Sequence, residues 1–166
     1  MRARILTRTD RGSVSLWLII FAFAVLVLLG FVVDGGQYMN ARERAADIAQ
    51  QAARAAVDDL NTGQLRHGDF VIPAAACQPG GPAYTLVSES AGNSASIPAG
   101  DCQIGGLMDG ACQVPAPAGS QGPCVQVTVD ITVNPAMPFG PFGTLTTTAT
   151  EQATLDCGNA NEGGAC

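Results

Sequence analysis

Cysteine is the residue type most able to do chemistry in this chain of 166 residues, and it occurs six times. An even number of cysteines in a small region rich in Gly and Pro is typical of a disulfide framework formed in an oxidising compartment. The spacing leaves many pairings open. The candidate disulfide residues are Cys77, Cys102, Cys112, Cys124, Cys157 and Cys166.

A zinc site is the alternative use of these cysteines. Structural zinc sites usually place two ligands only a few residues apart, whereas the shortest step between cysteines here is nine residues. The single histidine, His67, has no metal-ligand spacing to any cysteine. We therefore favour disulfides and expect no metal or other cofactor.

The other polar residues do not form a recognisable catalytic set. His67 lies in a polar turn, where it is best read as a solvated loop residue. Asp58 and Asp59 are adjacent, and on a helix their side chains would point about 100° apart, so they do not form an acid–base pair. The glycine pairs at 80–81 and 105–106 are not expected to precede a helix, as a phosphate-binding loop does. The sequence thus predicts that the protein is not an enzyme.

Residues 14–33 form an uncharged apolar run without proline. At a rise of about 1.5 Å per residue, this run spans the thickness of the hydrocarbon core of a bilayer. It should be helical, because lipid cannot satisfy free backbone N–H and C=O groups. The alternative is the core helix of a soluble protein, which rarely needs this length without a polar face. We therefore expect a membrane protein that contacts lipid.

The charges on either side of this run predict its orientation. Residues 1–13 carry four Arg and one Asp, whereas residues 34–166 carry four Arg and thirteen acidic residues. Because basic flanks stay on the cytoplasmic side, we expect a single-pass protein of the cell membrane with a cytoplasmic N-terminus. The run is too long for a cleaved signal peptide and has no small-x-small exit, which favours an uncleaved anchor. The acidic exterior argues against nucleic-acid binding.

Residues 37–60 contain no Gly or Pro and consist largely of good helix formers. Small apolar residues on one face of this helix favour close packing against another helix rather than a deep globular core. Asp34, Gly35 and Gly36 join this helix to the membrane run. They either form a hinge at the membrane surface or continue one rod about 70 Å long. The residues of the predicted packing face are Tyr38, Ala41, Ala45, Ile48, Ala52 and Ala55.

The last third of the chain predicts a β-hairpin. Residues 125–133 alternate between apolar and polar side chains, as half-buried strands do. Residues 144–155 also alternate, with a row of threonines at 144, 146, 148 and 150 on one side. Cys124 and Cys157 lie just outside the ends that antiparallel pairing would bring together, so we expect a disulfide between them. The connector at 134–143 carries two Phe that could lie on the sheet or on lipid.

The middle of the chain is rich in Gly, Pro, Ala and Ser. We expect short strands at 70–72 and 84–87 and a loop over 88–122. The overall prediction is an α+β membrane protein in which one long N-terminal helix precedes a small disulfide-linked β-rich extracellular domain. Its four regions are a basic cytoplasmic N-terminus (1–13), a transmembrane helix (14–33), an Ala-rich extracellular helix (34–62) and a Cys-containing domain with long loops (63–166).

Three features of residues 11–60 together resemble a known family. They are the Arg11-Gly12 start, the Val33-Asp34-Gly35 exit from the apolar run, and the Ala-rich helix with Arg44-Ala45 and Arg54-Ala55. This stretch resembles the N-terminal module of Tad-type (tight adherence, Flp) pilus-assembly proteins of the TadE/TadG kind. The resemblance implies a minor pilin-like subunit or assembly factor, with other pilin-like or pilus-assembly membrane proteins as partners in a hetero-oligomer.

The chain departs from the prepilins of such systems at one position. Those proteins carry a glutamate five residues after the cleavage glycine, and here that position is Trp17. The departure favours an uncleaved, TadG-like assembly factor over a subunit of the fibre. A membrane-anchored extracellular module that binds a ligand or a cell-wall polymer is the alternative function.

Overall fold

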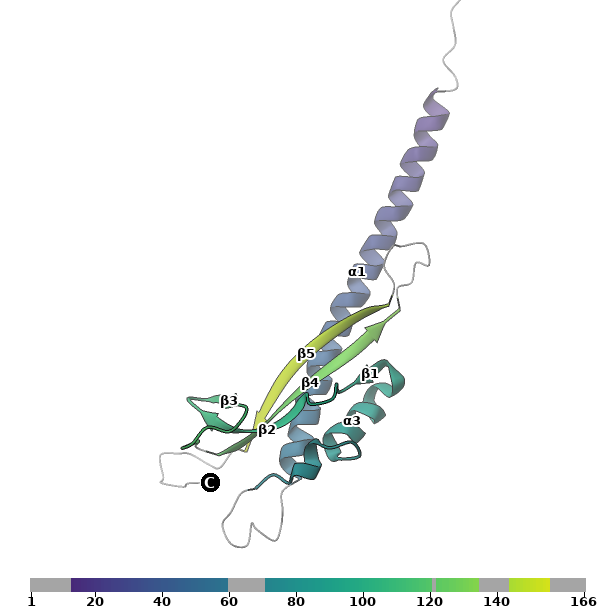
Figure 1. Ribbon diagram of the computed structural model, residues 1–166. Helices are drawn as coiled ribbons and strands as arrows, with labels where there is room; N and C mark the ends of the chain where they lie inside the picture. The colour runs from purple at the N-terminus through teal and green to yellow at the C-terminus, as the bar shows by residue number, and fades with distance from the viewer. Residues whose placement is uncertain (1–12, 60–70, 121, 135–143, 156–166) are drawn as a thin grey trace, which may run out of the picture.

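One helix, α1 (Ser13–Asp58), is the axis of the molecule in the computed structural model, which describes residues 13–59, 71–120, 122–134 and 144–155 (Figure 1). With 46 residues it is about 69 Å long at 1.5 Å per residue. The helix runs without a break through Gly35 and Gly36, so the structure adopts the continuous rod rather than the hinge.

The two halves of α1 have different surroundings. Every large hydrophobic side chain of residues 14–33 is exposed, and this half of the helix stands clear of all strands (Figure 1). Among the hydrophobic side chains of α1, the buried ones lie between Ala41 and Val57. One uninterrupted helix therefore joins a bare apolar segment to the core of a folded domain.

The predicted hairpin is confirmed. Strand β4 (Pro123–Val133) pairs antiparallel with β5 (Leu145–Thr154), in a register that runs from Cys124 opposite Thr154 to Val133 opposite Leu145. β4 is the central strand, because its other edge pairs with β1 (Ala95–Ser96) and β2 (Cys102–Met108). β3 (Ala111–Gln113) extends the sheet from β2.

The strand predicted at 84–87 is wrong, because these residues lie in a second helix, α3 (Pro82–Ala91). Tyr84 to Val87 has a high β-propensity, but Pro82 stands at the helix start, where its fixed φ suits the first turn. Gly92, with φ 55°, ends the helix. Ala83 and Val87, four residues apart, share the buried side of α3. Helix ends and burial thus outweigh local propensity.

The loop predicted over 88–122 is also wrong, since it contains β1, β2, β3 and a short 3-10 helix, η2 (Gly92–Ser94). β2 escapes recognition because Gly105 and Gly106 interrupt its alternation. A Cβ on Gly105 would collide with the carbonyl oxygen of Gln113, and one on Gly106 would collide with Ser120. Glycine is therefore required at both positions, because residues 113–120 fold closely over β2 there.

The remaining strand prediction, at 70–72, is wrong for the two residues that the structure describes. Val71 and Ile72 are in no strand, and they lead into a 3-10 helix, η1 (Ala74–Cys77). Phe70 and residues 135–143 of the connector predicted at 134–143 lie outside the described residues.

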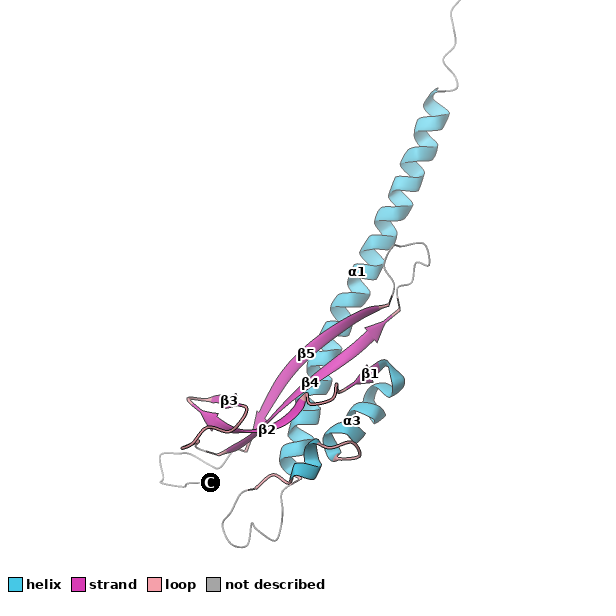
Figure 2. Ribbon diagram, in the orientation of Figure 1, coloured by secondary structure: helices cyan, strands magenta, loops and turns pink. Residues whose placement is uncertain are grey.

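The domain has two layers, with α1 and α3 on one face of the sheet (Figure 2). Alternate residues of β4 point into the space between the layers, and the opposite face of the hairpin carries mostly Thr. On that open face the Thr128 and Thr150 hydroxyls lie 2.9 Å apart and Thr148 donates to Asp130 at 2.6 Å. The β4 and β5 side chains of the core are Val125, Val127, Val129, Ile131 and Ala153.

Two disulfides tie the domain together, which supports the predicted framework for four of the six cysteines. Cys77 pairs with Cys102, and Cys112 pairs with Cys124, with Cα–Cα distances of 5.2 and 5.7 Å. The predicted bridge between Cys124 and Cys157 is therefore wrong. Cys112 reaches Cys124 because residues 113–114 fold across β2 at Gly105. Cys157 and Cys166 lie outside the described residues.

Candidate functional site

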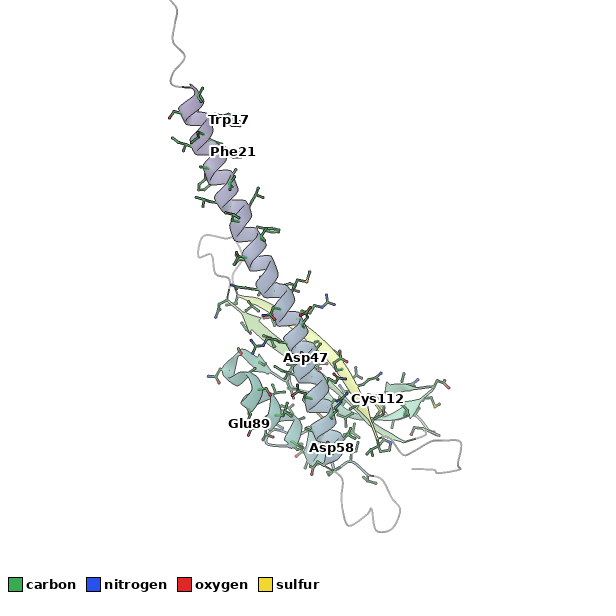
Figure 3. All side chains as sticks on the ribbon, turned by 180° about the vertical axis from the view of Figure 1, so that it is seen from behind. Trp17, Phe21, Asp47, Asp58, Glu89 and Cys112 are labelled. Atoms are coloured by element: carbon green, nitrogen blue, oxygen red, sulfur yellow. A yellow bond between two sulfur atoms is a disulfide. The ribbon has the colours of Figure 1, made fainter. Side chains whose placement is uncertain are left out.

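The exposed half of α1 is the most unusual surface of the molecule. Sixteen large hydrophobic side chains of residues 14–33 are exposed, each by 38% or more. Trp17 and Phe21, one turn apart, stack with ring centroids 5.6 Å from each other and project from the helix (Figure 3). A folded protein in water rarely leaves an apolar patch of this size uncovered, so this surface is a candidate contact surface for lipid or for other apolar helices.

Below this segment, the predicted packing face of α1 is in contact with the chain's own domain. Ala41, Ala45, Ile48 and Ala52 are buried, Ala55 is half-buried, and Tyr38 is exposed. The helix contacts β4 and β5 on one side and α3 on the other. Small side chains allow this close approach, so the alanines build an intramolecular core against the sheet and against α3 of the same chain.

The sequence interpretation missed half of this face. Ala49, Ala53, Ala56 and Val57 are buried as well, although they lie off the stripe that the spacing singled out. The face is wide because α1 has two neighbours, a sheet and a helix, instead of one. The signal was present in the sequence as a second alanine stripe, displaced by one residue from the first.

The polar residues considered for catalysis are not brought together. Asp58 and Asp59 are exposed at the end of α1, and His67 lies outside the described residues. Within the described ranges, no group of three or more His, Cys, Asp or Glu could hold a metal ion.

The glycine pair at 80–81 does precede a helix, contrary to the prediction, because Gly81 is the N-cap of α3. It nevertheless offers few free N–H groups. Gly81 donates its N–H to Gln78 at 2.8 Å, and Pro82 has none to donate. Gly105 and Gly106 lie inside β2, where the prediction that no helix follows them is confirmed.

These features define a class of protein: a small α+β domain built on the C-terminal half of one long helix whose N-terminal half is bare and apolar. In the part of the chain that the structure describes, α1 is the one helix long and apolar enough to cross a membrane, by length and composition. Almost none of its most apolar window is buried, which argues against the core helix of a soluble protein.

Comparison with known families is consistent with this class. Residues 12–59 match the family Tad, described as Flp pilus-assembly TadE/G-like. The match covers the whole of α1 and confirms the resemblance seen in the sequence. It supports a component of a Tad pilus-assembly system. Comparisons with curated proteins and with solved structures gave no match.

Proposed function

We propose that this protein is a single-pass membrane component of a Tad-type pilus or secretion system. Residues 14–33 span the membrane, the N-terminus is cytoplasmic and the β-rich domain is extracellular. The protein acts as a minor pilin-like subunit or an assembly factor through contacts with other pilin-like membrane proteins.

The observation that carries this proposal is the division of one helix into a bare half and a buried half. Burying a large apolar side chain is worth about 1.5–3 kcal/mol, so leaving sixteen of them in water forfeits on the order of tens of kcal/mol. Insertion into a bilayer recovers this free energy. Because α1 is continuous, it transmits any movement of the membrane segment directly to the domain.

The intramolecular burial of the alanine face indicates where partners bind. Ala45, Ala49 and Ala52 have no exposed surface to offer another subunit. Partner helices are therefore expected to contact residues 14–33 in the membrane, where Ala22 and Ala24 are small exposed residues that permit close approach. Extracellular partners are expected to contact the domain from outside.

Co-purification tests this function. The tagged full chain, extracted from membranes of its own host in a mild detergent, is expected to bring down other Tad components. A matched variant replaces residues 14–33 with a leucine run of equal length, which keeps the anchor and removes the specific helix surface. Loss of the partners in that variant supports helix packing. Recovery of no Tad component with the unaltered chain contradicts the proposal.

Fractionation separates the two roles. An uncleaved assembly factor, which Trp17 favours, stays in the membrane pellet at full length when surface fibres are sheared off. A shortened form in the sheared fraction would instead identify a fibre subunit. Cell-wall or ligand binding by the washed membrane protein, without Tad partners, would favour the anchored binding module.

A further inference from the structure

A half-open pocket of about 260 Å³, lined by both polar and apolar side chains, lies where the end of β4 meets α1. Gln37, Asn40 and Arg44 form one wall, and their spacing of three and four places them on one face of the helix. The opposite wall is the end of β4, including Thr132 and Asn134. The volume lies below the range of about 300–1,000 Å³ typical of drug-sized ligands, so the pocket suits a small polar group.

The lining side chains are suited to an anion. Arg44 carries a planar guanidinium with a fixed fork of N–H donors, which matches a phosphate oxygen pair. Gln37, Asn40 and Asn134 each add an amide NH₂ donor. No carboxylate is among the described residues that line the pocket. The Ser94 hydroxyl already donates to the carbonyl oxygen of Ala91 at 2.6 Å, so it is not counted among the free donors.

Arg44 is available for such a ligand. It is exposed, and the described residues provide it with no ion pair. The Cα–Cβ bonds of a helix tilt toward its N-terminus, which favours extension of the Arg44 side chain toward Asn40 and the apolar segment. That side of the domain faces the membrane in the anchored orientation.

The position of the pocket relative to the span identifies the source of the anion. Gln37 lies four residues beyond Val33, which is about 6 Å along the helix, and Arg44 lies about 16 Å beyond it. The polar headgroup region adds only about 5–8 Å to each side of the hydrocarbon core. The mouth of the pocket at Gln37 therefore reaches the headgroup layer, and the long Arg44 side chain can snorkel toward that layer from the extracellular side.

We propose that this pocket binds a phosphate-bearing group, supplied by the headgroup of a phospholipid, with Arg44 as its cationic ligand. This inference rests on the proposed membrane anchoring. It adds a second, polar attachment that fixes the rotation of the domain about α1 relative to the bilayer. A rigid helix with an apolar span alone would leave that rotation free.

Native mass spectrometry of the full chain in a maltoside detergent tests this site. Phosphatidylglycerol is titrated against the unaltered chain, Arg44→Gln and Arg42→Gln. Arg42 is the matched control, because it is an exposed arginine only two residues away on the same helix that does not line the pocket. We expect Arg44→Gln to weaken retention of one lipid by about tenfold to a hundredfold, as loss of a charged hydrogen-bonding partner does. Arg42→Gln should retain it.

The outcomes are distinct. Equal retention by Arg44→Gln and the unaltered chain overturns the proposal, and so does equal loss in both variants, which would indicate general charge attraction. Arg44-dependent displacement of the lipid by millimolar glycerol 3-phosphate or inorganic phosphate would support a phosphate site, whereas Arg44-dependent binding of those soluble ions without any retention of the lipid would overturn the phospholipid source. The lipid-retention measurement needs no Tad partner. A negative result here can therefore be distinguished from a negative result in the co-purification of Tad components.

Discussion

The backbone N–H of Cys112 donates a hydrogen bond to the side-chain oxygen of Gln152 at 2.9 Å, which joins β3 to β5 across 40 residues of chain. β4 separates β5 from β2, the partner of β3, within the sheet. The contact is possible only because β3 folds over the open face of the hairpin, with Cys112 bonded to Cys124 beneath it. This corner closes the end of the domain farthest from the apolar half of α1 (Figure 1).

The Cys112–Cys124 bridge should stabilise this corner. Replacing both residues with Ser frees β3 and leaves a polar hydroxyl at position 124, where the cysteine has no exposed surface. We expect a loss of about 2–4 kcal/mol in the free energy of unfolding, measured by urea denaturation of the full chain in detergent. The single change Gln152→Ala should cost about 1 kcal/mol. Additivity of the two losses would show that the bridge and the hydrogen bond do not cooperate.

The alanine face should tolerate no increase in side-chain size. Ala45→Leu inserts three carbon atoms at a position with no exposed surface, so we expect destabilisation by about 1–3 kcal/mol. The matched control is Ala46→Leu, because Ala46 is the neighbouring, half-buried alanine of the same helix. Thermal unfolding of both variants should separate them by several degrees. Equal melting temperatures would contradict the intramolecular packing of this face.

The Gly35–Gly36 pair should accept alanine. Both glycines are helical, and a Cβ at either position would meet no atom within 4 Å. Replacing both with Ala should stabilise the helix by about 0.5–1 kcal/mol per residue. This stabilisation should be visible as slower amide hydrogen exchange around residues 34–40. If the variant folds well but no longer recovers Tad partners, the glycines serve a bending motion that the static rod does not display.

Gly105 should reject alanine, in contrast to Gly35 and Gly36. Its Cβ would collide with the backbone oxygen of Gln113 and with Val114, and a backbone atom cannot rotate out of the way. We expect Gly105→Ala to shift β3 from the hairpin and to destabilise the domain by about 1–3 kcal/mol. Limited proteolysis between residues 108 and 120 offers a local readout. Unchanged protease resistance and stability would show that β3 can move at little cost.

The membrane segment should be sensitive to charge at its centre. Leu26 lies near the middle of residues 14–33, and an Arg there costs about 2.5–3.5 kcal/mol on insertion scales. Leu26→Arg should therefore lower the fraction of protein that resists alkaline extraction from membranes. Leu26→Phe is the control that keeps the segment apolar. Full extraction of the unaltered chain by alkali would contradict the anchor itself.

Local periodicity accounts for the parts of the fold that were predicted correctly. The apolar run, the helix beyond it and the alternating strands β4 and β5 each carry a pattern that depends only on near neighbours in sequence. The same reasoning failed for α3 and β2. In α3, the residues from Tyr84 to Val87 have the propensity of a strand, but burial of the helix against α1 outweighs it. In β2, two glycines interrupt the alternation because another segment of the chain lies against them.

The sequence by itself determined that this chain has a membrane-length apolar helix, a helical extension and a β-hairpin, because hydrophobic spacing specifies which side of an element is buried. It did not determine what covers that side. Only the tertiary structure decided that the alanines of α1 face the chain's own sheet, that Cys124 pairs with Cys112, and that Arg44 meets the end of β4 in a pocket. Each of these depends on contacts between distant segments, which no local pattern encodes.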